Sequence, residues 1–179
     1  MTTRDSVYIA LFTALMASMA VFPQVPLAMG IPFVLQSIVP MLAGSIIGAW
    51  RGAMSMVLFL ILVAIGLPLL TGGRGGLAIL LGPTGGFALS WIVVAAVVGL
   101  LTQRQSNAGL AYRIAVNVIG AIIISYPIGI LWMAMVTPTS SIKAIATTCS
   151  VFIPGDLIKV VVAALISRAV QRAYPLIDR

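Results

Sequence analysis

Charged residues are scarce in this chain. Asp, Glu, Lys and Arg make up 7% of its 179 residues, and only three of them are acidic, whereas soluble domains carry about 25% charged residues. Hydrophobic residues make up 61%, and the mean hydropathy is +1.21. This composition excludes an ordinary soluble domain and predicts an integral membrane protein that lies almost entirely in the bilayer.

Histidine is absent, and cysteine occurs once, at Cys149. An intramolecular disulfide, a His-ligated metal site and the common catalytic triads are therefore excluded. Only one carboxylate, that of Asp156, lies within a candidate site, so paired-carboxylate or metal-assisted catalysis lacks its parts. We predict that the chain is not an enzyme and holds no cofactor or metal. No ATP-binding motif is present, so the chain cannot hydrolyse ATP on its own.

Long apolar runs between proline and glycine breakers are abundant, and they predict an all-α bundle of about six transmembrane helices. The six predicted helices cover Val7–Phe22, Phe33–Ala49, Gly52–Leu67, Thr84–Leu101, Ala111–Val136 and Ile153–Ala173. Together they form a single domain over residues 1–179. Pro127 lies inside the fifth helix, where we expect a kink.

The ten basic residues give a net charge of +7, but they stand mostly at the ends of apolar runs. That placement indicates membrane topology rather than nucleic-acid binding. With both termini in the cytoplasm, seven arginines lie inside, whereas Arg74 and Lys143 lie outside. The connections at 23–32, 68–83 and 137–150 then face outward as long loops, which could form the mouth of a ligand site.

The strongest candidate site is a pair of opposite charges, Asp156 and Lys159, in the sixth predicted helix. Ionisable residues at membrane depth are costly and usually functional. Pro154 and Gly155 place Asp156 in the first helical turn, where the helix dipole favours a carboxylate. The pair could serve only to cap and pack the helix, or it could bind a polar organic anion. We favour ligand binding because the pair begins on the face with the long loops.

A glycine-rich segment with one cation is the second candidate. Arg74 is the only charge between Thr71 and Gly86. The run Gly82-Pro83-Thr84-Gly85-Gly86 opens the fourth helix with a proline and permits close backbone approach to a ligand. The alternative is a solvated flexible loop.

Three polar residues lie within apolar helices and complete the set of ligand candidates: Gln36, Asn117 and Tyr126. Each could instead bond only to a neighbouring helix. Small residues spaced four apart, at Ala10 and Ala14 and at Gly44 and Gly48, permit close helix packing. Internal packing is the default for such spacing, and contact with a partner is the alternative.

The motifs Gly82-Pro-Thr-Gly-Gly86 and Phe152-Ile-Pro-Gly-Asp156-Leu-Ile-Lys159 resemble those of BioY, the biotin-specific substrate-binding (S) component of energy-coupling factor (ECF) transporters. An early Ala-x-x-x-Ala, a proline-rich first loop and Gly66-Leu-Pro68 extend the resemblance over nearly the whole chain. Order and spacing together make it specific.

The resemblance implies a six-helix membrane subunit that binds biotin near its outer face. It implies partners as well: a transmembrane coupling subunit and a pair of ABC-type ATPases. The resemblance also implies roles for single residues: Ala10 and Ala14 would dock on the coupling subunit, and Asp156 and Lys159 would contact biotin. The expected location is the cytoplasmic membrane of a bacterium or archaeon, surrounded by lipid, with a homo-oligomer possible when the chain is alone.

Three other functions are considered. An S component for another vitamin would keep the architecture, but the two motifs argue against it. A membrane-embedded enzyme lacks catalytic groups, as above. A pore would need a ring of polar residues from an oligomer.

Overall fold

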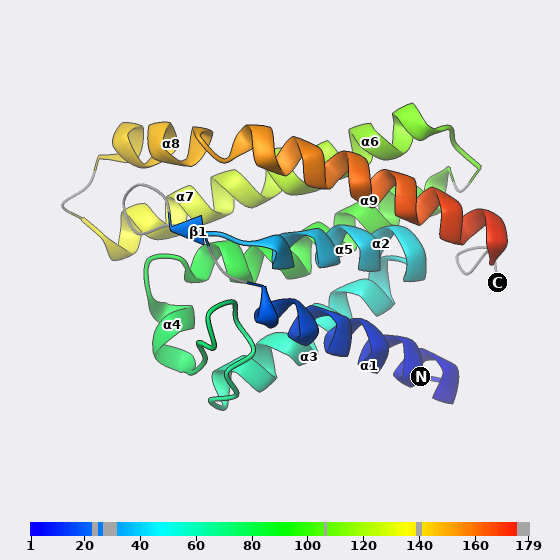
Figure 1. Cartoon of the computed structure of the whole chain (residues 1–179), viewed down its shortest axis with the longest axis horizontal. Coiled ribbons are helices and arrows are strands. Elements are labelled where there is room, and N and C mark those ends of the chain that lie inside the picture. Colours follow the sequence, from blue (N-terminus) through cyan, green and yellow to red (C-terminus); the bar gives the residue numbers. More distant parts are fainter. Residues whose placement is uncertain (23–24, 27–31, 106, 139–140, 175–179) are drawn as a thin grey trace.

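The computed structural model describes residues 1–22, 25–26, 32–105, 107–138 and 141–174, and nearly all of these are helical (Figure 1). The α-helices are α1 (Thr3–Ser18), α2 (Ile38–Ile47), α3 (Ala49–Ala64), α4 (Leu77–Leu81), α5 (Gly85–Arg104), α6 (Leu110–Val118), α7 (Ser125–Val136), α8 (Ile142–Ser150) and α9 (Ile153–Ala173). Shorter helical turns cover η1 (Met19–Val21) and η3 (Leu35–Ser37), and the π-helix η4 (Ile119–Ile124) joins α6 to α7. Two-residue strands β1 (Val25–Pro26) and β2 (Pro32–Phe33) pair antiparallel. The all-α prediction is confirmed.

The count of about six spans agrees with the structure only approximately. Three segments of the described chain are long and apolar enough to cross a membrane: Thr3–Val21, Gly85–Arg104 and Leu110–Val136. The pair α8 and α9, bent by 54°, would supply a fourth, while Leu35–Ile47 and Ala49–Ala64 are shorter apolar helices. A 16-residue helix such as α3 is about 24 Å long at 1.5 Å per residue.

The helix α5 lies at the centre of the bundle and packs against α2, α3 and α7, while α9 packs against α2 and α6. Glycines allow the backbones of neighbouring helices to approach each other closely. A Cβ at Gly44 in α2 would lie 2.4 Å from the carbonyl oxygen of Ala95 in α5. One at Gly52 would lie 3.0 Å from the backbone nitrogen of Gly44. The prediction of internal packing is therefore confirmed for the Gly44–Gly48 spacing.

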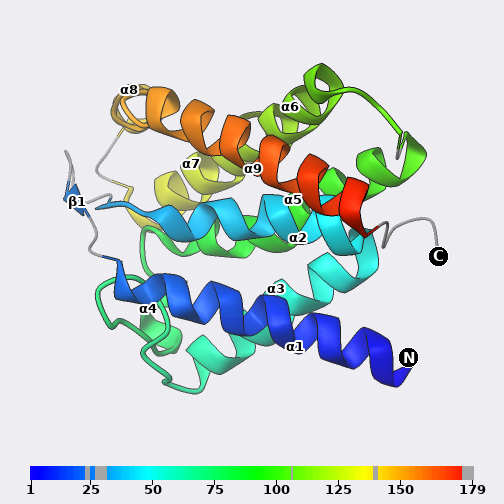
Figure 2. The same ribbon diagram turned by 45° about the vertical axis from the view of Figure 1, so that its right-hand side comes forward.

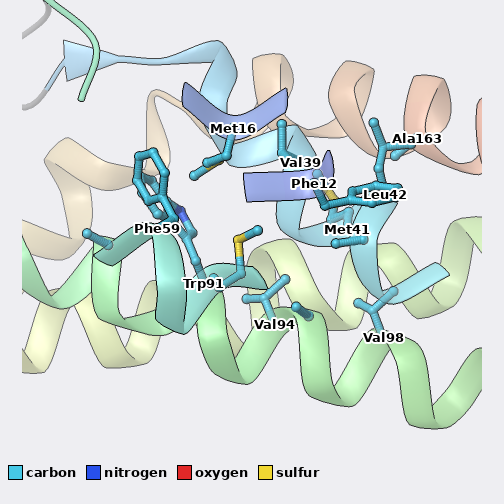
Figure 3. Packing of buried hydrophobic residues seen from close by; sticks show 14 of the residues in the cluster. Phe12, Met16, Val39, Met41, Leu42, Phe59, Trp91, Val94, Val98 and Ala163 are labelled. Atoms are coloured by element: carbon cyan, nitrogen blue, oxygen red, sulfur yellow. The ribbon is translucent and has the colours of Figure 1, made fainter. Parts of the chain in front are cut away.

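Apolar side chains from these helices form one large core. It includes Phe12 and Met16 of α1, Phe59 of α3 and Trp91 of α5 (Figure 3). The rings of Phe59 and Trp91 meet at 6.1 Å between centroids. A smaller, separate cluster of Met133, Ile145, Cys149 and Phe152 joins α7, α8 and the start of α9. Residues of both clusters line the cavity described below.

The prediction of a long loop at 137–150 is wrong in part, because residues 142–150 form α8. Its longest apolar run covers only residues 144–146, and Ile145 and Cys149 are buried while most of the others are exposed. The interruptions by Lys143, Thr147 and Thr148 hid the helix from a search for long apolar runs. In the fifth predicted helix, the backbone irregularity near Pro127 takes the form of the π-helix η4, which ends three residues before that proline.

The two ends of the bundle differ. The start of α1 and the end of α9 lie at one end, while α4, β1 and the start of α8 lie at the other, in both views (Figures 1 and 2). At the first end, Asp5 of α1 accepts a 2.7 Å bond from Arg51 of α3. The longer connections of the described chain therefore gather opposite the termini, as the sequence predicted.

Candidate ligand site

A cavity opens near the end of the bundle that carries α4 and α8. The space that the centre of a water molecule can reach there measures about 130 Å³, whereas one water needs only about 10–15 Å³ by the same measure. Its walls are mostly apolar and include Met41, Leu80, Phe87, Trp91 and Phe152. Such a cavity, with a few polar groups, is typical of a small-molecule site.

The charged pair predicted from the sequence lies in the wall of this cavity. Lys159 donates to Asp156 Oδ1 at 2.7 Å, and the hydroxyl of Tyr126 donates to Asp156 Oδ2 at 2.7 Å. Both oxygens of the carboxylate are thus held by protein donors from two helices, α9 and α7. The structure brings together the three residues that the sequence proposed independently.

Lys159 is 5% exposed, and its ammonium group is surrounded by acceptors. Besides Asp156, it donates to the carbonyl of Val34 at 2.8 Å and to Ser37 Oγ at 2.9 Å. The three ammonium hydrogens therefore each have a protein acceptor. Because desolvating an ammonium is costly, this geometry is what permits the charge to be buried.

Capping does not explain Asp156. The N-cap of α9 is Phe152, with no side-chain capping bond, and Asp156 lies within the first turn, its backbone nitrogen bonded to the Phe152 carbonyl at 3.0 Å. Its carboxylate turns to the cavity instead. Asp156 therefore does not cap the helix, although its ion pair with Lys159 at i,i+3 is present.

Arg74 also lines the cavity, at the end of a tight turn. The backbone groups of Leu70 and Arg74 bond to each other at 2.9 and 3.2 Å, and Gly72 and Gly73 between them have φ of +82° and +67°. Arg74 Nε donates to the carbonyl of Thr71 at 3.4 Å. Among the described residues, the ion pairs are Asp5–Arg51 and Asp156–Lys159. Arg74 is thus a cation at the cavity that no described carboxylate neutralises.

The run from Gly82 to Gly86 divides between lining and support. Thr84 and Gly85 line the cavity, and a Cβ at Gly85 would lie 1.7 Å from the carbonyl oxygen of Leu80. Gly82 and Gly86 lie outside the lining: the Gly82 carbonyl accepts from Trp132 Nε1 at 2.9 Å, and a Cβ at Gly86 would lie 2.2 Å from Trp132 Cβ. These two glycines therefore contact the Trp132 side chain and hold it near the start of α5.

Gln36 lines the cavity, but Asn117 does not. Asn117 is fully buried in α6, where its Nδ2 donates to the Arg113 carbonyl at 2.8 Å, four residues earlier in the same helix. It therefore lies apart from the other candidates.

The sequence matches the BioY family over residues 1–176. This chain belongs to the BioY family. A protein named biotin transporter BioY from Rhodobacter capsulatus is 42% identical over 181 residues, covering 96% of this chain and 95% of that protein. Another of that name, from Rhizobium etli, is 44% identical over 186 residues, covering 99% and 98%. The crystal structure of an S-component for biotin from an ECF-type ABC transporter has a TM-score of 0.88 and 30% identity, covering 96% of this chain and 95% of that one.

BioY is a family of transporters, so the prediction that this chain is not an enzyme is confirmed. Within the part of the chain that the structure describes, no group of three or more Cys, Asp or Glu residues gathers where a metal ion could bind. What the cavity offers is hydrogen-bonding and apolar contact, which is the chemistry of binding.

Several cavity residues of this BioY member were missed by sequence reasoning. Trp91 and Phe87 supply aromatic walls from α5, and Ser37 and Ser125 add hydroxyls. Apolar helices contain many aromatic and serine residues, so no local pattern separates those that face a cavity from those that face the core.

The small residues of α1 do not follow the default expectation that such spacing serves internal packing. Ala10 and Ala14 are exposed, as are Val7 and Leu11, whereas Phe12 and Met16 are buried. Internal packing is therefore wrong for this pair. In this BioY member the small-residue stripe lies on the outer surface of the bundle.

Proposed function

We propose that this chain binds biotin in the cavity and carries it across the membrane as the substrate-specific subunit of an ECF-type transporter. The observation that carries the proposal is the buried set of Asp156, Lys159 and Tyr126 in a cavity wall, in a chain of the BioY family. A membrane protein tolerates buried charges mainly where they serve a ligand or an ion.

Asp156 is the proposed acceptor for the N–H groups of the ureido ring. Each carboxylate oxygen accepts one protein bond and keeps a further lone pair. Tyr126 has donated its hydroxyl hydrogen to Asp156, so its oxygen remains an acceptor. Lys159 already has three protein acceptors, so its proposed role is to orient the Asp156 carboxylate. A neutral, polar ring fits a pair whose charges cancel.

Arg74 is the proposed partner of the biotin carboxylate. Among described cavity residues it is the cation that no carboxylate neutralises, and a guanidinium binds a carboxylate through strong charge-assisted bonds. The thiophane ring and the aliphatic chain would lie between the two ends, against Trp91, Phe87 and Leu80. Thr84 and Gly85 complete the wall near the start of α5.

Transport needs partners, which we propose to be a transmembrane coupling subunit and a pair of ABC-type ATPases. The exposed stripe at Ala10 and Ala14 is the proposed docking surface for the coupling subunit, because small residues permit close helix approach. We further propose a multi-pass protein of the cytoplasmic membrane with both termini inside. The distribution of arginines supports this orientation. Formation of a homo-oligomer by the isolated chain remains a prediction.

Calorimetric titration of the purified chain with biotin tests the binding proposal. We expect saturable binding, with biotin preferred over thiamin and riboflavin in competition. Asp156→Asn and Lys159→Ala should each weaken binding by about a hundredfold or more, because each breaks a buried charge pair. The double variant Asp156→Asn/Lys159→Met removes both charges and so should keep the fold, yet it should not bind.

The matched control is the other described ion pair, Asp5–Arg51, which lies outside the cavity lining. The variant Asp5→Asn/Arg51→Met should bind biotin as the unmodified chain does. Normal biotin affinity in the Asp156 and Lys159 variants would overturn the proposed site. Preference for another vitamin would overturn biotin as the substrate.

A further inference from the structure

Gln36 of η3 is 1% exposed and has every hydrogen-bonding position of its side-chain amide occupied. Its Nε2 donates to the carbonyls of Met16 at 3.0 Å and Leu69 at 2.7 Å. Its Oε1 accepts from the backbone nitrogen of Thr71 at 2.9 Å and from Thr71 Oγ1 at 2.8 Å. An amide offers two donors and two acceptor positions, so no position remains for a ligand.

The orientation of this amide follows from its partners. Two carbonyl oxygens can only accept, and the Thr71 backbone nitrogen can only donate. Turning the amide over would place donor against donor and acceptor against acceptor. The four bonds therefore specify one arrangement of the end of α1, η3, and the chain from Leu69 into the turn that ends at Arg74.

The cavity has two polar ends, the Asp156–Lys159 pair and Arg74. The segments that Gln36 joins contact both of them. On one side, Val34 and Ser37 of the same segment accept from Lys159, which orients Asp156. On the other side, Thr71 begins the turn that presents Arg74, and its carbonyl accepts from Arg74 Nε. Gln36 thus lies between the two ends and is bonded to the base of the second.

The turn needs such an anchor because it contains two glycines with positive φ, Gly72 and Gly73. Glycine leaves the backbone many conformations. The two backbone bonds between Leu70 and Arg74 close the turn, but they do not attach it to η3. The bonds from Gln36 to Leu69 and Thr71 restrain the turn on its N-terminal side. An unrestrained arginine would lose affinity to the entropy of ordering it.

We propose that Gln36 is a positioning residue that sets the spacing between the Asp156–Lys159 pair and Arg74, and that it thereby makes the site select a ligand with a carboxylate at one fixed distance from its polar ring. This inference rests on the proposed function. The sequence-based expectation was that Gln36 contacts the ligand. We infer instead that Gln36 enables the site to discriminate between ligands with a charged tail and ligands with an uncharged tail.

The test compares biotin with biotinamide, in which a neutral carboxamide replaces the carboxylate. The unmodified chain should prefer biotin by about ten- to hundredfold, the value of a charge-assisted bond. Gln36→Met keeps the side-chain length but removes all four bonds, and it should lower this preference to that of Arg74→Gln. The double variant Gln36→Met/Arg74→Gln should bind biotin no more weakly than Arg74→Gln alone, because coupled residues are non-additive.

Gln171→Met is the matched control. Gln171 is also buried, at 8% exposed, and its Nε2 donates to the carbonyls of Ser45 and Ile46 at 2.9 and 3.4 Å, but it does not line the cavity. It should keep the full preference for biotin over biotinamide. A Gln36→Met variant that weakens both ligands equally, and so keeps the preference, would overturn the inference.

If Gln36→Met does not fold, Thr71→Val provides the second test, because it removes only the hydroxyl bond to Gln36 Oε1 at 2.8 Å. It should lower the preference partly, and Thr71→Ser, which keeps the hydroxyl, should restore it. An unchanged preference in Thr71→Val would contradict the inference. Failure of the unmodified chain to bind biotin would contradict the proposed function as well, which separates the two outcomes.

Discussion

At the scale of single residues, the buried ammonium group of Lys159 is the most informative feature. Two of its acceptors, Val34 and Ser37, lie more than 120 residues before it in the sequence, and the third, Asp156, lies three residues before it. The pair itself was predictable, because two charges one helical turn apart are conspicuous in an apolar helix. The partners from η3 were not, since a backbone carbonyl and a serine carry no distinguishing pattern.

Tyr126→Phe should weaken biotin binding about tenfold. The change removes the 2.7 Å bond from the phenol to Asp156 Oδ2, and a bond to a charged group contributes about 1.5–3 kcal/mol. Calorimetric titration measures the effect.

Tyr112→Phe is the control for this change, because the Tyr112 hydroxyl also makes a partly buried bond, to the Leu101 carbonyl at 2.9 Å, but Tyr112 does not line the cavity. It should leave biotin affinity unchanged while lowering thermal stability slightly. Equal affinity of the Tyr126 variant and the unmodified chain would show that the phenol does not orient Asp156.

At the scale of elements, α1 and α8 depart most from the sequence-based expectations. The small-residue stripe of α1 faces outward, because Phe12 and Met16 on the opposite face fill the core. Spacing alone could not determine this, since the same spacing at Gly44 and Gly48 is internal. The polar helix α8 was missed, although it supplies Cys149 to the cavity.

Ala10→Trp and Ala14→Trp should abolish ATP-dependent biotin uptake in cells that supply the coupling subunit and ATPases. Both positions are exposed, so an indole would prevent close helix approach on the proposed docking surface without disturbing the core. Biotin binding by the purified variants should be normal. Uptake of labelled biotin and co-purification with the coupling subunit are the measurements.

Ala115→Trp is the matched control for α1, since Ala115 is likewise exposed, on α6. It should support uptake. If the α1 variants also transport normally, the docking surface lies elsewhere on the molecule.

At the scale of the whole molecule, the two ends of the bundle have different compositions. The start of α1, which carries Arg4, and the end of α9, which carries Arg172, lie at one end (Figures 1 and 2). The cavity is lined by residues of α4 and the start of α5, at the other end. This separation fits a membrane protein that receives its ligand on one side and holds its basic residues on the other.

Labelling of single cysteines tests the orientation. In a Cys149→Ala background, which has no other cysteine, Lys143→Cys should react with a membrane-impermeant maleimide in intact cells. Gln105→Cys and Tyr174→Cys should react only after permeabilisation. All three positions are exposed, so access depends on the side of the membrane rather than on burial. The reverse labelling pattern would place the termini outside.

The sequence by itself determined the class of protein, most of the helices and the residues with the strongest electrostatic signature. Scarce charge and long apolar runs leave few options in a bilayer. Asp156 and Lys159 are conspicuous because charge within an apolar helix is costly, and Arg74 because it is the only charge in its glycine-rich segment. Only the tertiary structure decided which neutral residues serve the site. Gln36 faces Thr71, Asn117 faces its own helix, Gly82 and Gly86 support Trp132, and Trp91 lines the cavity. Hydrogen-bond partners distant in the sequence meet only after the helices pack, so no local pattern contains them.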